Sequence, residues 1–217
     1  MFENIIKNVH NRHPLIHCIT NYVSINDCAN IVLACGGAPI MAEDINEVSQ
    51  ITSICQGLDI NIGMLNDNKL SSMLKAGATA NELGIPVILD PVGAGSSDYR
   101  IKAVQNLMSN VQFGVIRGNV SEIKAIAAKQ GIHNIAAGVY ETMQKNKSAM
   151  GVEAGIADKI TDDNIKEMAD FINKLSQKTG AVIAVTGGID MVADENRVYA
   201  IRNGHKLSLI HISEPTR

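Results

Sequence analysis

The sequence predicts an α/β protein, a three-layer α/β/α sandwich with a mostly parallel central sheet. Short apolar runs alternate with longer segments of helical periodicity, a pattern typical of parallel strands joined by helices. The run at residues 87–89 has no polar alternation, which indicates a strand covered on both faces. Polar residues or glycines follow several runs directly, as at the sheet edge where α/β proteins bind ligands.

The first half of the chain is expected to alternate strictly between strand and helix. An amino-terminal helix over residues 2–10 would direct Phe2, Ile5, Ile6 and Val9 inward. Strands are then expected at residues 15–19, 38–41, 58–62 and 87–89, and helices at residues 25–34, 67–83 and 99–108. A further helix is expected to follow a turn at residues 42–44 and to run through Cys55. Glycines end two of these helices, at residues 36–37 and at Gly84.

The second half follows the same pattern less regularly. A strand at residues 113–117 ends on the charged Arg117, and a helix follows at residues 121–129. Residues 131–160 are expected to be a loop with a helical piece. The pattern then continues with a helix at residues 161–179 and a buried strand at 181–186. It ends with a hairpin of two strands, 191–193 and 198–201, that turns at Glu195–Asn196.

Composition excludes several classes of partner. The formal net charge of -3 gives no general attraction to nucleic acid or to an anionic membrane. With 3% aromatic residues and no tryptophan, the chain lacks the side chains on which bases stack. Its amino end has neither a signal-peptide pattern nor a membrane span, so we expect a cytoplasmic protein that binds neither nucleic acid nor membrane.

Cysteine usage also favours the cytoplasm. Cys18, Cys28, Cys35 and Cys55 form no CxxC pair, so we expect them to be reduced. Cys28 and Cys35 lie seven residues apart on one helix, and we expect both to be buried as small hydrophobic residues.

The most informative stretch surrounds Asp90. This acid stands where the central strand stops, and Gly93 and Gly95 after it allow a ligand to approach the backbone closely. Ser97 or Asp98 can cap the next helix, whose amino end favours an anion. A carboxylate beside such a turn suggests the chemistry of a magnesium nucleotide. The alternative is an ordinary strand end followed by turn residues.

Other strand ends carry unusual residues as well. Those of interest are Thr20, Asn21, Met41, Asn61, Gly63, Arg117, Thr186 and Gly187, and a parallel topology would place them at one edge, in one pocket. Arg117 can brace phosphate oxygens. Asn119 and Glu122, three residues apart at a helix start, can face one ligand, and Glu122 suits an outer ligand of hydrated Mg²⁺. Alternatively, Asn119 or Ser121 caps the helix and Glu122 serves that cap.

The remaining sequence patterns give no sign of a metal site or of several common catalytic motifs. His17 has no second histidine or acid at a spacing typical of metal ligands, so we interpret it as a core or rim histidine. The sequence contains no GxSxG, HExxH or GxxxxGK[ST], which disfavours a standard serine hydrolase, a zinc protease and a P-loop NTPase.

Taken together, the strand-end motifs resemble those of the hydroxyethylthiazole kinase family. The segments that carry the resemblance, in the same order, are residues 14–23, 37–42, 61–63, 84–95, 115–122 and 184–187. The likeness covers nearly everything from Pro14 to about Lys206. It implies a ribokinase-like fold and a role in thiamine salvage, in which ATP phosphorylates the hydroxyl of 4-methyl-5-(2-hydroxyethyl)thiazole with Mg²⁺ as cofactor.

The resemblance also implies roles for individual residues. Substrate would contact Met41, Asn21, Val23 and Gly63; ATP would contact Arg117, Thr186 and Asn119; and Asp90 and Glu122 would organise the metal. The family forms trimers with the thiazole site at subunit boundaries, so a homotrimer is the expected state of an intact chain.

The chain departs from the family pattern after Lys206. A Gly-Thr-Gly-Cys loop, which supplies an anion hole and the catalytic cysteine in the family, is absent here, so no catalytic residue is assigned. Residues 207–217 look instead like the translation of a sequencing adapter. We therefore expect one kinase domain over residues 1–206, incomplete at its carboxyl end, a non-native tail over 207–217, and a polypeptide that is inactive and prone to aggregate.

Two other functions stay open at this point. One is a different ribokinase-like kinase, acting on a pyrimidine alcohol or a vitamin B6 alcohol. The other is a non-catalytic protein that binds a nucleotide or a thiazole without transferring phosphate.

Overall fold

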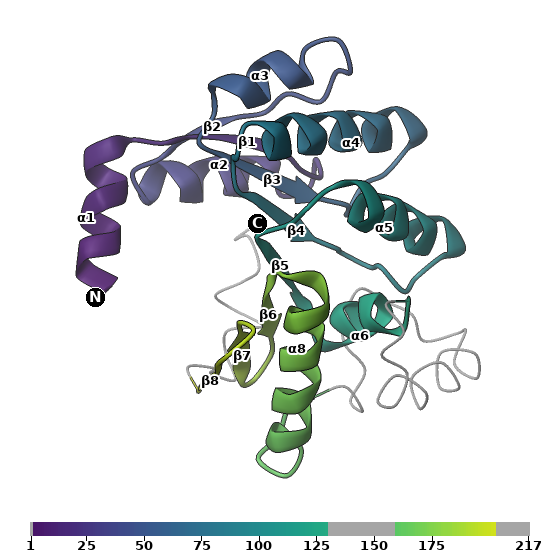
Figure 1. Ribbon diagram of the computed structural model, residues 1–217. Coiled ribbons are helices and arrows are strands. Elements are labelled where there is room, and N and C mark those ends of the chain that lie inside the picture. Colours follow the sequence, from purple (N-terminus) through teal and green to yellow (C-terminus); the bar gives the residue numbers. More distant parts are fainter. Residues whose placement is uncertain (1, 130–158, 203–217) are drawn as a thin grey trace. The chain divides into compact units, whose positions relative to one another are not determined.

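The computed structural model describes residues 2–129 and 159–202 (Figure 1). The chain divides into two compact units, Met1–Ile116 and Arg117–Arg217. The tail predicted for residues 207–217 lies outside the described residues, as does nearly all of the loop predicted for residues 131–160. Along the described ranges, no helix has the length and the apolar character that a membrane crossing needs.

The first unit is built on a parallel sheet. Its strands are β1 (Leu15–Ile19), β2 (Ala38–Ile40), β3 (Gly57–Asn61) and β4 (Val87–Asp90), in the spatial order β2-β1-β3-β4. The start of β5 (Val115–Asn119) pairs in parallel with β4, where Leu89 lies opposite Ile116. Each of these pairs is parallel, as predicted, so the carboxyl ends of the strands share one edge.

Five helices belong to this unit: α1 (Phe2–Arg12), α2 (Ile25–Ala34), α3 (Val48–Ile54), α4 (Asp67–Glu82) and α5 (Asp98–Asn110). Helices α3, α4 and α5 follow one another over one face of the sheet, and α2 lies on the other face (Figure 1). Gly77 allows the close packing of α4, because a Cβ atom there would lie 2.5 Å from Cγ2 of Val111. The core of this unit contains fully buried Ile60, Met73 and Leu89.

Three predictions for this unit are wrong in detail. Ile5 and Ile6 are exposed, not inward, because α1 extends away from the sheet (Figure 1). Helix α3 begins at Val48, later than a start directly after residue 44, because residues 44–47 form a turn in which the Asp44 side chain accepts a hydrogen bond from the Asn46 backbone at 2.8 Å. Cys28 is half-buried and Cys35 is exposed, whereas both were expected to be buried.

Strand β5 begins and ends two residues later than predicted. The side chain of Asn81 binds both backbone groups of Gln112, donating to its carbonyl at 2.9 Å and accepting from its N–H at 2.7 Å. These contacts hold the peptide before Phe113 against the end of α4 instead of in the sheet. Arg117 consequently lies in the middle of the strand and not at its end.

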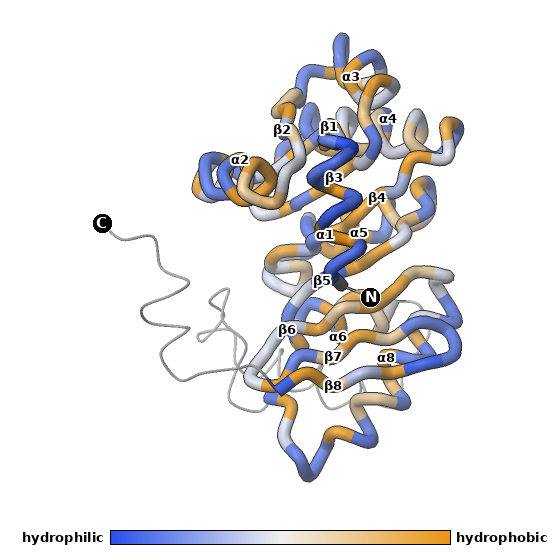
Figure 2. Tube along the Cα trace, turned by 90° about the vertical axis from the view of Figure 1, so that its left-hand side faces the viewer, coloured by the Kyte–Doolittle hydropathy of each residue, from blue (hydrophilic) through white to orange (hydrophobic). Residues whose placement is uncertain are grey.

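The second unit contains helices α6 (Val120–Lys129) and α8 (Ile165–Thr179) and the strands β6 (Val182–Thr186), β7 (Asp190–Ala193) and β8 (Val198–Ile201). The three strands are antiparallel neighbours, with Val185 opposite Met191 and Val192 opposite Tyr199. Helix α8 buries Phe171, Ile172 and Leu175 on one face, and the alternation of hydrophobic and hydrophilic residues along it can be followed in Figure 2.

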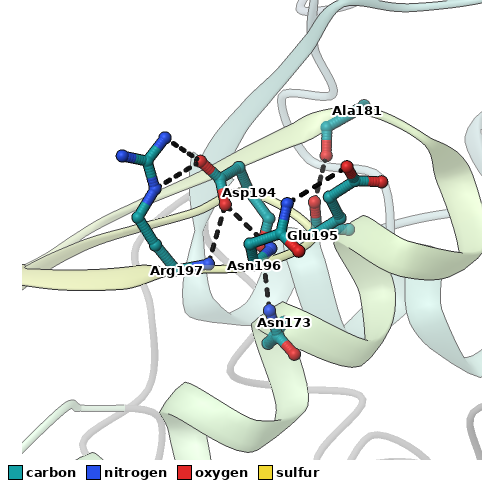
Figure 3. Close-up of polar contacts among 7 residues, drawn as sticks. Asn173, Ala181, Asp194, Glu195, Asn196 and Arg197 are labelled. Carbon is teal, nitrogen blue, oxygen red and sulfur yellow. Dashed lines mark hydrogen bonds and ion pairs between the residues drawn. The ribbon is translucent and has the colours of Figure 1, made fainter.

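The predicted hairpin between β7 and β8 is confirmed, and its turn is tied to α8 (Figure 3). The carboxylate of Asp194 accepts hydrogen bonds from the backbone of Asn196 at 2.8 Å and of Arg197 at 2.7 Å, and from the Arg197 guanidinium at 3.0 Å. From α8, the Asn173 side chain donates to the Asp194 carbonyl at 2.9 Å. The turn is therefore held by its own first residue and by the helix behind it.

Candidate functional site

Residues of the predicted site in the first unit lie at the carboxyl ends of its parallel strands. Asn21 follows β1, Met41 follows β2, Gly63 lies two residues after β3, and Asp90 is the last residue of β4. Their common edge is what the strand-end pattern predicted. Val23 lies in the loop after β1 and is 88% exposed.

Asn61 connects three of these strand ends. It is the last residue of β3, and its amide oxygen accepts hydrogen bonds from the Gly63 backbone at 2.8 Å and from Nδ2 of Asn21 at 3.2 Å. Its Nδ2 donates to Oδ2 of Asp90 at 3.0 Å. We call the chain Asn21–Asn61–Asp90 the asparagine relay. The sequence marked Asn61 as an unusual strand-end residue but gave it no role.

Arg100 braces the same edge from α5. Its guanidinium donates to the carbonyls of Ile62 at 2.6 Å, Val92 at 2.7 Å and Gly63 at 2.8 Å. The first and third of these groups follow β3, and the second follows β4. A guanidinium offers five N–H donors in a fixed fork, so one side chain can hold three carbonyls that a lysine could not reach together. Sequence reasoning missed this residue.

A buried lysine ties the loops after β1 and β2 together. Lys69, at the start of α4, forms an ion pair with Glu43 and donates to the carbonyl of Thr20. The Tyr22 hydroxyl donates to the same carboxylate. Sequence reasoning missed this lysine as well.

His17 is fully buried in β1, as a core histidine. Its Nε2 lies 2.8 Å from the carbonyl of Ala42 and its Nδ1 lies 2.9 Å from the hydroxyl of Thr52. Burial lowers the pKa of His17, and this outweighs the contrary effects of the Ala42 carbonyl and of Glu47. The imidazole is therefore neutral at pH 7, with its proton on Nε2, because a carbonyl can only accept.

The loop after Asp90 leads into a capped helix. Ser97 is the N-cap of α5, and its hydroxyl accepts a hydrogen bond from the Arg100 backbone at 3.2 Å. Of the two caps that the sequence left open, the structure uses Ser97. Gly93 has a φ of 66°, a conformation that glycine adopts without strain.

In the second unit, Asn119 and Glu122 form a reciprocal capping pair at the start of α6. Oδ1 of Asn119 accepts from the Glu122 backbone at 2.9 Å, and Oε2 of Glu122 accepts from the Asn119 backbone at 2.8 Å. This is the helix cap that the sequence offered as the alternative to a ligand site. One oxygen of each side chain is thus engaged in the cap, which leaves their role toward a ligand a prediction.

Arg117 and Thr186, the other predicted nucleotide contacts, also lie in this unit. Arg117 is exposed on β5. The hydroxyl of Thr186, at the end of β6, donates to the carbonyl of Gly118 at 3.4 Å, so the ends of these two strands lie side by side.

Within residues 2–129 and 159–202, no group of three or more histidine, cysteine, aspartate or glutamate side chains could hold a metal ion. Asp90 and Glu122 belong to different units, and their joint action on one metal stays a prediction. Magnesium is commonly held by one or two carboxylates together with phosphates and water, so a third protein ligand is not required.

Comparison with known proteins identifies relatives over nearly the whole chain. The model of the hydroxyethylthiazole kinase family matches residues 6–162 and 132–213. A hydroxyethylthiazole kinase of Clostridium acetobutylicum is 52% identical over 205 residues, which are 94% of this chain and 69% of the relative. This chain thus spans about two thirds of the length of that relative.

Solved structures agree with the fold prediction. The structure of a hydroxyethylthiazole kinase from Pyrococcus horikoshii OT3 aligns with a TM-score of 0.76 at 32% identity, covering 94% of this chain and 67% of that one. A phosphomethylpyrimidine kinase from Clostridium difficile 630 aligns with a TM-score of 0.55 at 12% identity, covering 89% of this chain and 87% of that one, and supports the fold alone. The predicted ribokinase-like α/β fold is confirmed.

Proposed function

Because the chain belongs to the hydroxyethylthiazole kinase family, a family of phosphotransferases that use ATP, we propose that it binds ATP and hydroxyethylthiazole and presents the alcohol for phosphorylation. The asparagine relay is the observation that supports this best. It bonds Asn21 and Gly63, assigned to the substrate by resemblance, to Asp90, assigned to the metal.

In the proposed reaction, the thiazole's hydroxyl oxygen forms a bond to the γ-phosphorus of ATP. The bond from that phosphorus to the β–γ bridging oxygen breaks, the hydroxyl proton passes to solvent, and ADP leaves. Such transfers depend mainly on positioning and on neutralising phosphate charge. Arg117 would supply positive charge, and Thr186 and Asn119 would supply polar contacts to the nucleotide.

We propose Mg²⁺ as the cofactor. Asp90 ends β4 and Glu122 is 7% exposed near the start of α6, and both offer the carboxylate oxygens that this hard cation prefers. When bound, the ion would neutralise part of the phosphate charge.

We also propose a homotrimer in a reducing, cytoplasmic compartment. Large apolar side chains of α2 and of the loop before it are exposed, among them Val23, Ile31 and Leu33, which supports burial of part of this region between subunits. The four free cysteines support the compartment.

Phosphate transfer is considered separately from ligand binding, because the Gly-Thr-Gly-Cys loop that the resemblance links to catalysis is not among the 217 residues. We propose that this polypeptide binds both ligands and transfers phosphate poorly. Loss of one anion-hole donor already slows an enzyme by roughly a hundred- to a thousandfold.

Calorimetry and an ADP-release assay test the proposal together. We expect hydroxyethylthiazole and MgATP to bind, with little ADP release until a relative's Gly-Thr-Gly-Cys segment is joined after Lys206. A preference of the joined enzyme for a pyrimidine or pyridoxine-type alcohol would favour a different small-alcohol kinase. Binding that never leads to transfer would favour a binding protein, and the absence of all binding would refute the proposal.

A further inference from the structure

We propose that Asn61 is a positioning residue that couples binding of the alcohol to binding of the magnesium nucleotide, an inference that rests on the function proposed above. Asn61 lies opposite Asp90 in the parallel register of β3 and β4, and only 7% of it is exposed. Its side chain stands between the residues assigned to the two ligands. Neither the family resemblance nor the strand-end pattern gave it this role.

The orientation of the Asn61 amide is determined by its partners. The Gly63 N–H can only donate, so the oxygen of the amide must face it. The NH₂ group is then directed to the carboxylate of Asp90, which accepts at 3.0 Å. Because the two ends of one rigid, planar group are engaged on opposite sides, a displacement of Asp90 also displaces the acceptor that holds Gly63 and Asn21.

The backbone around Asn61 leaves little room to absorb such a displacement. Arg100 holds the carbonyls of Ile62 and Gly63, and the N–H of Ile62 donates to the carbonyl of Asp90 at 3.1 Å. A Cβ atom on Gly63 would lie 2.9 Å from Oδ1 of Asn61 and 3.0 Å from Nδ2 of Asn21. Only a glycine allows this close approach, so the segment is built around the asparagine amide.

A cation and phosphates bound near Asp90 would draw its carboxylate and thereby shift the relay. Contacts that Asn21 and Gly63 make with the alcohol would then improve, and by thermodynamic reciprocity the alcohol would strengthen nucleotide binding by the same factor. Couplings of this kind typically amount to about five- to 150-fold in affinity.

The test is calorimetric titration of the 217-residue chain with hydroxyethylthiazole, with and without saturating MgADP. MgADP lacks the transferable phosphate, so direct contact between that phosphate and the hydroxyl does not contribute. For the wild-type chain, we expect MgADP to raise the affinity for the thiazole about fivefold or more. Asn61→Leu keeps the branched shape of the side chain, which then makes no hydrogen bonds. The ratio of thiazole affinities with and without MgADP should fall to about 1 in this variant.

A second variant separates the two ends of the relay. Asn61→Asp keeps an oxygen for Gly63 and Asn21 but replaces the donor to Asp90 with a second carboxylate, which repels that of Asp90. The enhancement of thiazole affinity by MgADP should be lost in this variant. This variant also carries the test if Asn61→Leu does not fold.

Asn81→Leu is the matched control. It also removes two hydrogen bonds of an asparagine side chain, to Gln112, but at an exposed position at the end of α4, away from the relay. It should retain the wild-type ratio. The coupling is overturned if MgADP leaves the thiazole affinity of the wild-type chain unchanged, or if both Asn61 variants keep the full enhancement; the proposed function then stays intact. A wild-type chain that binds neither ligand overturns both the coupling and the proposed function.

Discussion

The ammonium group of Lys69 lies 2.7 Å from the carboxylate of Glu43, and the lysine side chain is only 3% exposed. The same ammonium lies 4.8 Å from the centre of the Tyr22 ring. Tyr22 follows Asn21 directly, and Glu43 follows Met41 by two residues, so this ion pair joins the two loops assigned to the substrate. Through this one lysine side chain, helix α4 contacts both loops.

We expect Lys69→Met to loosen these loops. The free energy of unfolding should fall by about 1–3 kcal/mol, the usual cost of losing hydrogen bonds to a charged group. Affinity for hydroxyethylthiazole should fall about tenfold, while affinity for MgADP stays within about twofold. Urea denaturation and calorimetry measure these quantities. Lys75→Met is the control, because Lys75 donates to the Ile45 carbonyl at an exposed site. An equal loss of thiazole affinity in this control would contradict the assignment.

The same ion pair predicts a response to acid. Partial burial acts to raise the pKa of Glu43, but hydrogen bonds from Lys69 and Tyr22 outweigh it and hold the pKa below the usual 4.5. A carboxyl group whose pKa is lowered in the folded state stabilises the fold above its unfolded pKa. This contribution should therefore be lost as the pH falls below about 4.5, and less so in Lys69→Met.

Arg100 should not be replaceable by lysine. Arg100→Lys keeps the charge but cannot reach the carbonyls of Ile62, Gly63 and Val92 together, so we expect the free energy of unfolding to fall by about 2 kcal/mol or more. Affinity for both ligands should fall, because the segments after β3 and β4 lose their common brace. Arg197→Lys, at an exposed hairpin, serves as the control and should change the unfolding free energy by less than about 0.5 kcal/mol.

His17 should make stability depend on pH in the opposite sense from a salt-bridged histidine. Its pKa is lowered by burial, so the unfolded chain binds a proton more readily than the folded one. The free energy of unfolding should fall as the pH drops from about 6.5 toward the folded pKa, by at most about 1.4 kcal/mol per pH unit. Urea denaturation between pH 5 and 8 would show this slope (roughly the range in which histidine titrates). His17→Gln should flatten it, and an unchanged slope would assign the effect to another group.

Local patterns predicted most of this fold because strand and helix signals are themselves local. The alternation of apolar runs with helical segments placed β1, α2 and β4 within a residue of their observed bounds. It misplaced β5 because Asn81, more than thirty residues away in sequence, binds Gln112. The pattern of α1 correctly indicated an apolar face, but such a pattern does not say what covers that face.

The residues of the candidate site also differ in whether a local sequence pattern could predict them. The position of Asp90, Asn21 and Gly63 at one sheet edge could be predicted because they stand at or just past the ends of apolar runs, while their roles toward ligands stay predictions. Lys69 and Arg100 could not, because they reach the site from helices. Most of their partners are backbone carbonyls, which every residue carries and no sequence pattern marks.

Asp194 should control the β7–β8 hairpin. Hydrogen bonds from the backbone of Asn196, and then from Arg197, lower the pKa of Asp194 despite some desolvation. The hairpin should therefore be stable above the ordinary aspartate range and loosen as the pH falls below it. Asp194→Ala should increase hydrogen exchange at the amides of β8 even at neutral pH. Glu195→Gln, which keeps every contact of Asp194, should exchange like the wild type.

Glu122 allows the helix cap to be separated from the proposed metal role. Glu122→Gln retains an oxygen that can accept from the Asn119 backbone, so the cap should survive and the free energy of unfolding should change by less than about 1 kcal/mol. It removes the negative charge, so affinity for the magnesium nucleotide should fall about tenfold or more. Glu122→Ala removes both functions and should also lose about 1 kcal/mol of stability. Calorimetry with MgADP and urea denaturation of both variants distinguish the roles. Equal nucleotide affinity in the wild type and Glu122→Gln would leave this carboxylate as a helix cap alone.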